Sequence, residues 1–421
     1  MGNIVGDLMN DICEYAKLYS YEKVCEKFES RVIECNNAYL SYSFAYHVPC
    51  SNVDAHSKIV VNSGNVELNY LFAKDIKGAD IAAHGKVILD SKNPEYNYLF
   101  ASFVNETDID KHAKVVIVSK DAEYNFFFSF LKGADVKAHE QAIIESGDAF
   151  YNYRFADEVY DSDIEAHGKA VIDSKNAEYN YLFARDIRNA DIRAHGDAVI
   201  ASKDLEYNYK FAKNIPGADI KKHGRVIIDS KDMDYNYNFA RDIKGADIAA
   251  HGRVIIDGGY AELNYLFARN MDGSNIEAHG RAVIDSGSTK YNLYFASCIK
   301  GADVASHAKV VLDSKDPEYN YKFARDVKGA DIVAHEKVVI DSENLEYNYL
   351  FVENIPGADI KAHCQVAVNA RDYDYISKFE SILGSKYAKF NEEIFDAVIN
   401  RKIEILIGED KKPVTKTKHI V

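Results

Sequence analysis

Apolar and polar positions recur along the chain in one pattern, which is clearest between Asp219 and Asp247. In its first half, Ile220, His223, Val226 and Ile227 are spaced i, i+3, i+6 and i+7. This spacing places the four side chains on one face of an α-helix. Strands fit poorly because no stretch alternates with period two. The pattern therefore predicts a first helix.

The second half of the pattern predicts a second helix. Asn236, Phe239, Ala240 and Ile243 share one face at helical spacing. Gly245 follows, and we expect it to end this helix because glycine readily adopts the left-handed conformation. Each pattern should thus form one helical hairpin.

Short polar residues mark where each helix begins. Asp219 precedes the first helix and Asp232 the second, and a carboxylate there accepts hydrogen bonds from the free N–H groups of the first turn. Asp234 follows in the first turn, where negative charge is favourable. Pro94 and Pro317 fall at the first position of the second helix in their repeats, where proline loses no hydrogen bond.

The pattern returns every 28 residues through most of the chain. The histidines run His56, His84, His112, His139 and then every 28 residues from His167 to His363. The phenylalanines repeat independently, from Phe44 through Phe239 to Phe351. One residue is missing between Phe128 and His139, where Ser-Phe-Leu-Lys replaces the usual Ala-Arg-Asp-Ile-Lys. A fixed period of this length predicts a repeat array.

We therefore predict an all-α protein, an α-solenoid of about 13 two-helix repeats with terminal capping helices. Residues 1–34 would form an N-terminal cap with a degenerate first repeat, in which Phe28 stands at the histidine position. Residues 35–380 would form the array, 381–408 a C-terminal cap, and 409–421 a flexible tail.

Composition agrees with a folded protein of the cytoplasm. Hydrophobic residues make up 47% of the 421 residues and charged residues 28%. No apolar run approaches a membrane span, and the N-terminus lacks the features of a secretory signal. The six cysteines are scattered without a CxxC, which favours a reducing compartment and small buried side chains. We expect no membrane association.

The net charge of −15 argues against a basic DNA-binding stripe. Acidic and basic residues alternate within each repeat, as on a solvated helical surface. An acidic surface that repels or imitates nucleic acid stays open.

The repeated histidines invite a metal site, since Asp219 and His223 lie four residues apart. A metal site needs three or four converging ligands, whereas neighbouring repeats should lie roughly 8–10 Å apart. We therefore expect each histidine to pack between repeats and to bond with Asn, Tyr or a loop carbonyl. We predict no metal and no cofactor.

Asparagine and tyrosine recur just as regularly. A buried asparagine such as Asn236 needs hydrogen-bond partners, and we expect the same partner in every repeat, in the loop of the next repeat. Tyrosines such as Tyr179 and Tyr181 can stack nucleic-acid bases, but they more often flank a core with the hydroxyl in water. Glycine after the histidine, as at Gly224, predicts close backbone approach between helices.

Positions that differ between repeats are candidates for partner binding. They are the residue before each repeated phenylalanine and the residue two after it, which share an outward stripe of the second helix. A freely drifting solvated face is the alternative explanation. The candidate residues are Leu182, Arg185, Lys210, Lys213, Asn238, Arg241, Leu266, Arg269, Lys322 and Arg325. We find no catalytic motif in the chain.

The repeated sequence S-K-D-x-E-Y-N-Y-x-F-A-R-D-I-x-G-A-D-I-x-A-H resembles short helical repeats of uncharacterised bacterial and bacteriophage proteins, and more broadly the HEAT-like and leucine-rich-variant α-solenoids. The resemblance covers roughly residues 35–380. It implies an architecture and leaves the activity open, because such arrays bind unrelated partners.

We expect a non-enzymatic scaffold that binds a protein partner on the second-helix face. The repeated Arg and Lys residues of that face would orient an acidic partner. The alternative is a nucleic-acid-related protein, which either binds through the Lys/Arg column or inhibits a basic enzyme as an acidic mimic of DNA.

Overall fold

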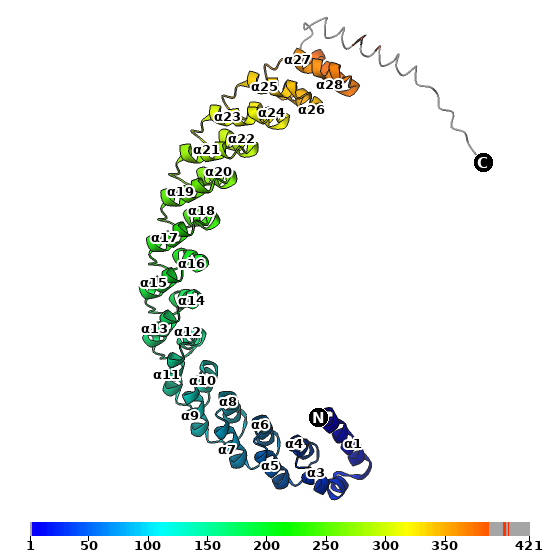
Figure 1. Ribbon diagram of the computed structural model, residues 1–421, viewed down its shortest axis with the longest axis vertical. Coiled ribbons are helices and arrows are strands. Elements are labelled where there is room, and N and C mark those ends of the chain that lie inside the picture. Colours follow the sequence, from blue (N-terminus) through cyan, green and yellow to red (C-terminus); the bar gives the residue numbers. More distant parts are fainter. Residues whose placement is uncertain (1, 387–398, 401–402, 404–421) are drawn as a thin grey trace, which may run out of the picture. The chain divides into compact units, whose positions relative to one another are not determined.

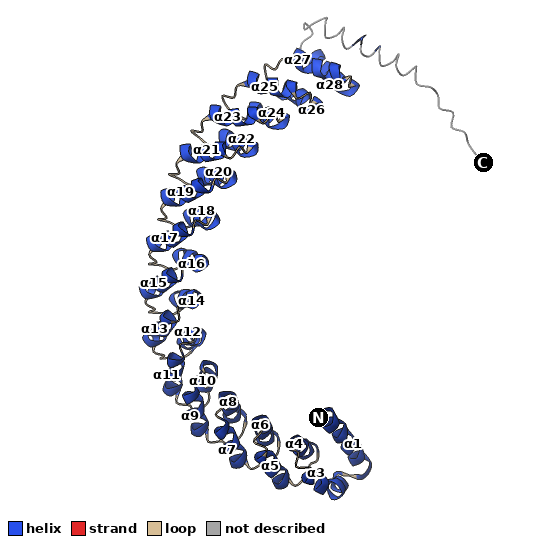
Figure 2. Ribbon diagram, in the orientation of Figure 1, coloured by secondary structure: helices blue, strands red, loops and turns tan. Residues whose placement is uncertain are grey.

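The computed structural model describes residues 2–386, 399–400 and 403, and every regular element among them is a helix (Figure 2). The chain divides into two compact parts, an N-terminal part up to Asp219 and a C-terminal part from Ile220. In each part, first helices, which carry the histidines, alternate along the chain with second helices, which carry the Tyr-Asn-Tyr triplet or its variants (Figure 1). The protein is an all-α α-solenoid of about 13 hairpins, as the sequence predicts.

The helices of the N-terminal part form two layers. Its second helices are α4 (Ala38–His47), α6 (Val66–Asp75), α8 (Pro94–Phe103), α10 (Ala122–Ser129), α12 (Ala149–Glu158), α14 (Ala177–Asp186) and α16 (Leu205–Asn214). Its first helices are α5 (Val53–Asn62), α7 (Ile81–Ser91), α9 (Ile109–Ser119), α11 (Val136–Ser146), α13 (Ile164–Asp173) and α15 (Ile192–Ser202). Helix α10, in the repeat that lacks one residue, is two residues shorter than the other second helices of this part.

The C-terminal part repeats the arrangement. Its first helices are α17 (Ile220–Ser230), α19 (Ile248–Gly258), α21 (Ile276–Asp285), α23 (Val304–Asp313), α25 (Ile332–Asp341) and α27 (Ile360–Ala370). Its second helices are α18 (Met233–Asp242), α20 (Ala261–Asn270), α22 (Thr289–Cys298), α24 (Pro317–Asp326), α26 (Leu345–Asn354) and α28 (Tyr373–Lys386). Within each part, successive second helices lie side by side, as do successive first helices.

The predicted cap at Asp232 is present, and Asp247 caps the first helix of the following repeat in the way predicted for Asp219. Asp247 accepts a hydrogen bond from the backbone N–H of Ala250 at 3.0 Å, and Asp232 accepts one from Tyr235 at 2.9 Å. Each cap satisfies one of the free N–H groups that a helix start leaves, a contribution of typically about 1 kcal/mol. Pro94 and Pro317 lie at the first position of α8 and α24, as predicted.

A serine and a left-handed residue make the turn within most repeats. The Ser230 hydroxyl donates to the carbonyl of Ile227 at 2.7 Å and accepts from the backbone N–H of Asp232 at 3.0 Å. Lys231 between them has φ +59°, a conformation that the sequence pattern did not reveal because lysine is not typical of it. The same left-handed position is held by Lys92, Lys120, Lys175, Lys203 and Lys315.

The prediction that Gly245 ends the second helix is wrong by three residues. Helix α18 ends at Asp242, and Ile243 is already extended, with φ −109° and ψ 111°. Its N–H still donates to the Phe239 carbonyl at 3.1 Å, while its side chain is buried. Gly245 does have φ +91°, so the glycine serves the connecting turn rather than the helix end.

Each repeat shares its core with the next one. Tyr237 and Ala240 of α18 pack with Ile255 of α19 and with Phe267 of α20 in one buried cluster. The phenyl ring and the isoleucine are fully buried. Burial of a side chain of this size contributes roughly 1.5–3 kcal/mol, and because the cluster spans two repeats, neither can bury it alone.

The N-terminal cap is a helix followed by an interrupted hairpin. Helix α1 (Gly2–Tyr19) is followed by Ser20, which has φ +138° and caps the next helical stretch. That stretch runs through α2 (Tyr21–Val24), the π-helix η1 (Cys25–Glu29) and α3 (Ser30–Glu34). Helix α1 covers the first repeat through the cluster that contains Met9, Ile12 and Phe44.

At the other end, Phe379 of α28 is fully buried, as expected of a thirteenth repeat. The predicted C-terminal cap, 381–408, lies within the described residues only at its start and at 399–400 and 403, and the predicted tail, 409–421, lies outside them.

The prediction of small buried cysteines is wrong for most of the six. Cys35, Cys50 and Cys298 are exposed, and only Cys364 is buried. The Cys25 and Cys50 sulfurs lie 2.6 Å apart, although 25 residues separate them in the sequence. Burial and the neighbouring Cys50 raise the pKa of Cys25 to about 12.

Candidate functional site

The repeated histidine and asparagine form one buried hydrogen-bonded rung between repeats. His251 Nδ1 lies 2.7 Å from Asn236 Oδ1, and the Asn236 amide donates to the Ile227 carbonyl at 2.8 Å and to the Asp232 carbonyl at 2.6 Å. Both amide hydrogens are thus committed to carbonyls. The amide oxygen must therefore accept from the histidine, which fixes the imidazole with its proton on Nδ1.

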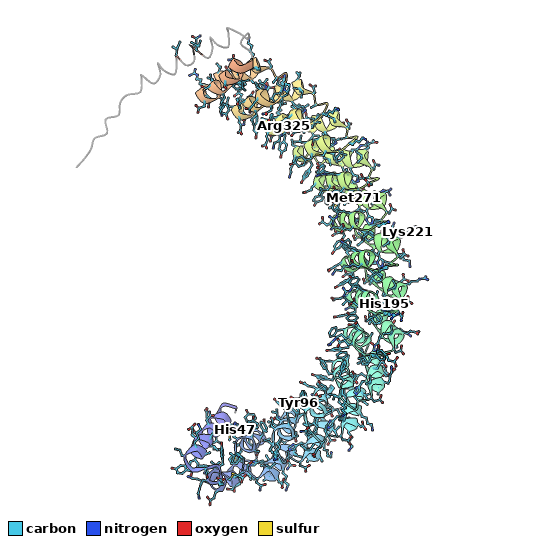
Figure 3. The ribbon with its side chains drawn as sticks, turned by 180° about the vertical axis from the view of Figure 1, so that it is seen from behind. His47, Tyr96, His195, Lys221, Met271 and Arg325 are labelled. Atoms are coloured by element: carbon cyan, nitrogen blue, oxygen red, sulfur yellow. The ribbon has the colours of Figure 1, made fainter. Side chains whose placement is uncertain are left out.

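Such rungs recur in both parts of the chain, with Nδ1–Oδ1 distances of 2.6–2.8 Å. In each one, the repeated phenylalanine stacks on the histidine of the next first helix, as Phe239 does on His251 at 4.9 Å between ring centroids. His195 in Figure 3 belongs to one of them. The first rung differs: Ser41 replaces the asparagine, and neither ring nitrogen of His56 has a hydrogen-bond partner among the described residues.

Burial shapes the acid–base behaviour of these histidines. It lowers the histidine pKa to about 4, from an ordinary value of 6.5, at His84, His112, His139, His167, His195, His251, His279, His307, His335 and His363. The imidazoles are therefore neutral at pH 7. Neutral, buried and stacked rings hold the repeats in register, which confirms the predicted packing role.

The asparagine prediction was right about a constant partner and wrong about its identity. The partner is the histidine of the next first helix together with the carbonyl of the preceding first helix, not the loop of the next repeat. The sequence contained the signal, because the two residues are separated by 15, as between Asn236 and His251, or by 14 in the repeat that lacks one residue, between Asn125 and His139.

The residue after each histidine faces the Nε2 atom of the next one. Ser57 lies 2.8 Å from His84 Nε2, while Glu140 and Glu336 place a carboxylate oxygen 3.5 and 3.3 Å from His167 and His363. Burial raises the pKa of Glu336. Both glutamates also accept from a backbone N–H 23 residues further on, at the start of the next first helix.

Glycine at the position after the histidine leaves room for side chains of the next repeat. The sequence had instead predicted a close approach of a neighbouring backbone. A Cβ on Gly252 would lie 3.0 Å from the ring of Phe267 and 3.2 Å from His279 Nε2. Gly168, Gly224 and Gly280 have the same two neighbours. The glycine therefore makes room for the rung of the next repeat.

The predicted partner-binding residues lie on the second helices, in two sets. Leu182, Arg185, Lys210 and Lys213 belong to the N-terminal part, and Asn238, Arg241, Leu266, Arg269, Lys322 and Arg325 to the C-terminal part. Those directly before the phenylalanine are half-buried, and those two residues after it are exposed. Figure 3 labels Arg325 on a second helix and Lys221 on a first helix.

Several exposed basic residues of these sets bond within their own helix. Arg241 makes two hydrogen bonds to Asp242, at 2.7 and 3.1 Å, and its guanidinium lies over the ring of Tyr237. Arg185 and Arg325 repeat this arrangement. The adjacent carboxylate balances each charge, and this hydrogen bonding raises the pKa of all three arginines.

Tyrosines join neighbouring second helices around these positions. The Tyr153 hydroxyl donates to Asp186 at 2.9 Å, and burial together with this bond raises the pKa of Tyr153 to about 12. In the C-terminal part, Asn270 donates to the Tyr237 hydroxyl at 2.8 Å. Tyrosine rings of successive repeats also approach each other, as Tyr321 and Tyr347 do at 6.1 Å. The variable residues therefore lie in a fixed tyrosine framework.

The sequence pattern did not reveal one feature of this surface, a group of exposed phenylalanines on α8, directly after α10 and on α12. Phe103 and Phe130 are 57% and 55% exposed, and Phe150 is 37% exposed. The sequence did contain a signal for this feature. Phe103 and Phe130 each take the place of a charged residue of the Arg-Asp pair that is usual in other repeats.

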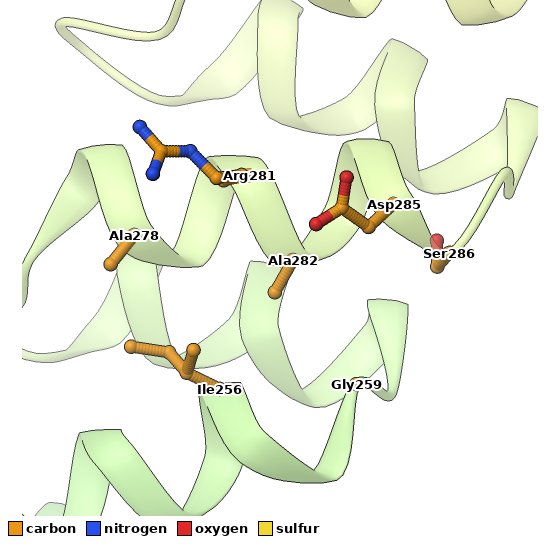
Figure 4. Close-up of a pocket in the computed structure, with 7 residues that line it drawn as sticks. All are labelled: Ile256, Gly259, Ala278, Arg281, Ala282, Asp285 and Ser286. Atoms are coloured by element: carbon orange, nitrogen blue, oxygen red, sulfur yellow. The ribbon is translucent and has the colours of Figure 1, made fainter.

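A groove between α19 and α21 has a volume of about 380 Å³ (Figure 4). Ile256, Ala278 and Ala282 line it, with Arg281 and Asp285 at its edge. Arg281 is paired with Glu277 at 2.9 Å. Ser286 also lines the groove, and its hydroxyl donates to the Val283 carbonyl at 2.6 Å, so it is engaged in the turn that follows α21.

Among the described residues, no three His, Cys, Asp or Glu side chains converge to hold a metal ion. None of the helices in the described part is both long and apolar enough to cross a lipid bilayer. Comparison of the chain with protein-family models and with curated protein sequences gives no match. The helical-hairpin repeat with its His–Asn pair is what characterises the chain.

Proposed function

We propose that the protein is a non-enzymatic scaffold that binds a protein partner on the surface of its second helices. The observation that carries this proposal is a contrast within each second helix. The buried Asn and Phe recur almost without change, whereas the residue before the phenylalanine is Leu182, Lys210, Asn238, Leu266 or Lys322. A rigid framework with changing side chains is suited to specific recognition of an extended partner.

The chemistry of the buried residues supports the same proposal. The repeated histidines are neutral, buried and bonded to asparagine, so they are not exposed to a substrate. Catalysis would need a titratable group accessible from a pocket. The exposed arginines bring stacked, pre-oriented guanidinium groups rather than net charge, because an aspartate accompanies each of Arg185, Arg241 and Arg325. Such groups favour directional contacts with a protein.

The test compares two variants that lose the same number of basic residues. The first variant replaces Arg185, Lys213, Arg241, Arg269 and Arg325 on second helices by Ser. The matched control replaces the exposed basic residues of the first helices, Lys169, Arg225, Arg253, Arg281 and Lys309, by Ser. Partners are captured with the unaltered protein from the organism that encodes it, and their affinity for each variant is then measured.

We expect the second-helix variant to bind its partner about tenfold or more weakly and the control to bind within about threefold of the unaltered protein. Equal weakening in both would contradict the assignment to the second helices. Nucleic acid as the captured partner, with binding that falls steeply as salt rises, would establish the alternative class instead.

A further inference from the structure

The second helices α8, α10 and α12 interrupt the regular surface in consecutive repeats. In regular second helices the second residue after the phenylalanine is basic and the third is aspartate or asparagine, as at Arg185 and Asp186. Helix α8 instead has Ser102 and Phe103, and α10 has Phe130 directly after Ser129. The changes replace charged pairs by exposed phenyl rings.

The rungs beneath this surface are intact. The His112–Asn97 bond is 2.7 Å long, and the His139–Asn125 bond is 2.8 Å long. Phe100 and Phe128 are buried as in the other repeats. The buried packing of these repeats is therefore regular, and only their exposed side departs from the pattern. A large exposed apolar group on a soundly packed helix typically marks an interaction site.

The aromatic rings of α10 and α12 are in continuous contact. Phe126 lies 5.1 Å from Phe130 and 5.8 Å from Phe127 between ring centroids. The Arg154 guanidinium lies 4.4 Å above the centre of Phe126 and 5.5 Å from that of Phe150. Phe126 itself is fully buried, so it supports the exposed rings from below the surface. We name the exposed Phe103, Phe130 and Phe150, with the half-buried Phe127 and Arg154, the aromatic patch.

The charges around the aromatic patch are mainly acidic. Helices α8 and α10 contain one glutamate each, Glu95 and Glu123, and no lysine or arginine. Helix α12 ends with Asp157 and Glu158, both exposed. Its one basic residue, Arg154, is paired with Glu158 at 2.7 Å. Lys132, two residues after Phe130, is exposed as well. A partner therefore meets phenyl rings bordered by more carboxylates than cations.

We propose that the aromatic patch docks an apolar segment of a partner protein that is flanked by lysine or arginine, and this proposal rests on the scaffold function above. Apolar side chains would cover Phe103 and Phe130, and the flanking cations would meet Glu95, Glu123 and Asp157. Aromatic side chains provide large contact area at low conformational cost, so they commonly anchor interfaces. The carboxylates disfavour the phosphates of a nucleic acid.

The test uses a variant that restores the regular surface, Ser102→Arg, Phe103→Asp and Phe130→Arg in the full chain. The matched control is Tyr260→Asp, which removes an aromatic side chain that is 61% exposed and lies outside the patch. Aspartate already caps α18, so the control should fold normally. The probe is an amphipathic peptide with one apolar face of Leu and Trp and flanking lysines. Because the chain contains no tryptophan, the peptide fluorescence reports binding directly.

We expect the lysine-flanked peptide to bind the unaltered protein and the Tyr260→Asp control equally, and the restored variant about tenfold or more weakly. A peptide with glutamate in place of lysine should bind the unaltered protein about tenfold or more weakly as well. Equal binding of the two peptides, or of the restored and unaltered proteins, would overturn the proposal. So would self-association of the unaltered protein that the restored variant loses, because a second copy would then cover the patch.

Failure here is distinguishable from failure of the scaffold function. If the restored variant binds the peptide normally while the second-helix serine variant loses its captured partner, the aromatic patch is not the docking site and the scaffold function stands. If neither variant affects any partner and the lysine peptide does not bind, both proposals are wrong.

Discussion

Helices α10 and α18 differ on their exposed side and agree on their buried side. In α18, Arg241 is bonded to Asp242 and stacks on Tyr237, whereas the exposed ring of Phe130 directly follows α10. Beneath these surfaces the rungs are alike, since Asn125 and Asn236 bond to their histidines at 2.8 and 2.7 Å.

The difference shows which positions of a repeat are free to change. The buried amide and imidazole satisfy each other, so replacement of either would leave a polar group without a partner in the core. The exposed residues make bonds that water can replace. Surface specialisation, such as the aromatic patch, can therefore arise on one repeat without disturbing its neighbours.

Acid should break both regions alike, and it is the largest effect that we expect. The buried histidines have a pKa of about 4 in the folded state and 6.5 in the unfolded state. Between pH 4 and 6.5 the unfolded chain therefore binds more protons than the folded one. This contribution to stability is complete above pH 6.5 and is lost as pH falls through 4. At pH 5 the loss is about 2 kcal/mol per histidine, and ten histidines share the shift.

Denaturant unfolding at a series of pH values, followed by circular dichroism, measures this loss. The free energy of unfolding should fall steeply from pH 6.5 to 5. Added salt should change the slope little, because desolvation of buried rings is not screened as surface repulsion is. A flat profile over this range would mean that the histidines are not buried as neutral groups.

Removal of one asparagine should break a single rung in either region. Asn236→Ala removes bonds to the Ile227 carbonyl, the Asp232 carbonyl and His251, and leaves their buried polar groups unsatisfied. We expect a loss of about 3 kcal/mol in the free energy of unfolding. Asn125→Ala should lose a similar amount, because its three bonds are equivalent.

The control for these variants is Asn238→Ala on the half-buried side of α18, two residues from Asn236. It should change stability by less than about 0.5 kcal/mol. Stability is compared by the shift in the denaturant midpoint, since a repeat array can unfold in steps. A much smaller loss for Asn125→Ala than for Asn236→Ala would show that the rungs beneath the aromatic patch are weaker than their geometry indicates.

The fold was predictable because each repeat presents the same local signals. Asp247 before Ile248 and Asp232 before Met233 predict helix starts by hydrogen-bond chemistry that involves only nearby residues. The 28-residue period then averages these signals over many repeats. The left-handed Lys231 was not predictable, because its conformation is imposed by the bonds of Ser230 and Asp232 on either side.

The candidate site was harder to predict because it depends on contacts between repeats. Spacing placed Arg241 outward but could not show that Asp242 and Tyr237 already engage it. The replacement at Phe130 was visible as an irregularity, yet its exposure depends on how α10 packs beside its neighbours. Side-chain exposure is a property of the assembled stack, so the repeated sequence alone does not give it.

Alanine in place of glycine should sharpen the comparison between the rungs. A Cβ on Gly252 would meet the Phe267 ring at 3.0 Å, whereas a Cβ on Gly85, below α8, would meet the Phe100 ring at 3.3 Å. Alanine gains about 1 kcal/mol over glycine within a helix, and overpacking opposes it. We expect Gly85→Ala to stabilise by about 0.5 kcal/mol and Gly252→Ala to destabilise by about 1 kcal/mol.

Denaturant midpoints of the two variants measure this difference. Ala113 occupies the same position in α9, so Ala113→Gly is the reverse control and should lose about 1 kcal/mol. Stabilisation by both alanines would show that the phenyl rings yield easily and that the glycines are not required for packing.

The smallest effect per residue should come from the serine variant of the second helices, Arg185, Lys213, Arg241, Arg269 and Arg325→Ser. Each exposed pair contributes less than about 1 kcal/mol, so the denaturant midpoint should move little although five residues change. Serine occurs naturally at the position of these basic residues, two after the repeated phenylalanine, at Ser102 of α8 and Ser297 of α22. The rungs that these helices form, His112–Asn97 and His307–Asn292, are as short as the others, at 2.7 and 2.6 Å. Helices with serine and helices with arginine therefore share one buried structure. A loss of several kcal/mol in the serine variant would contradict this, and would assign to the Arg–Asp–Tyr contacts a part of the stability that we attribute to the rungs.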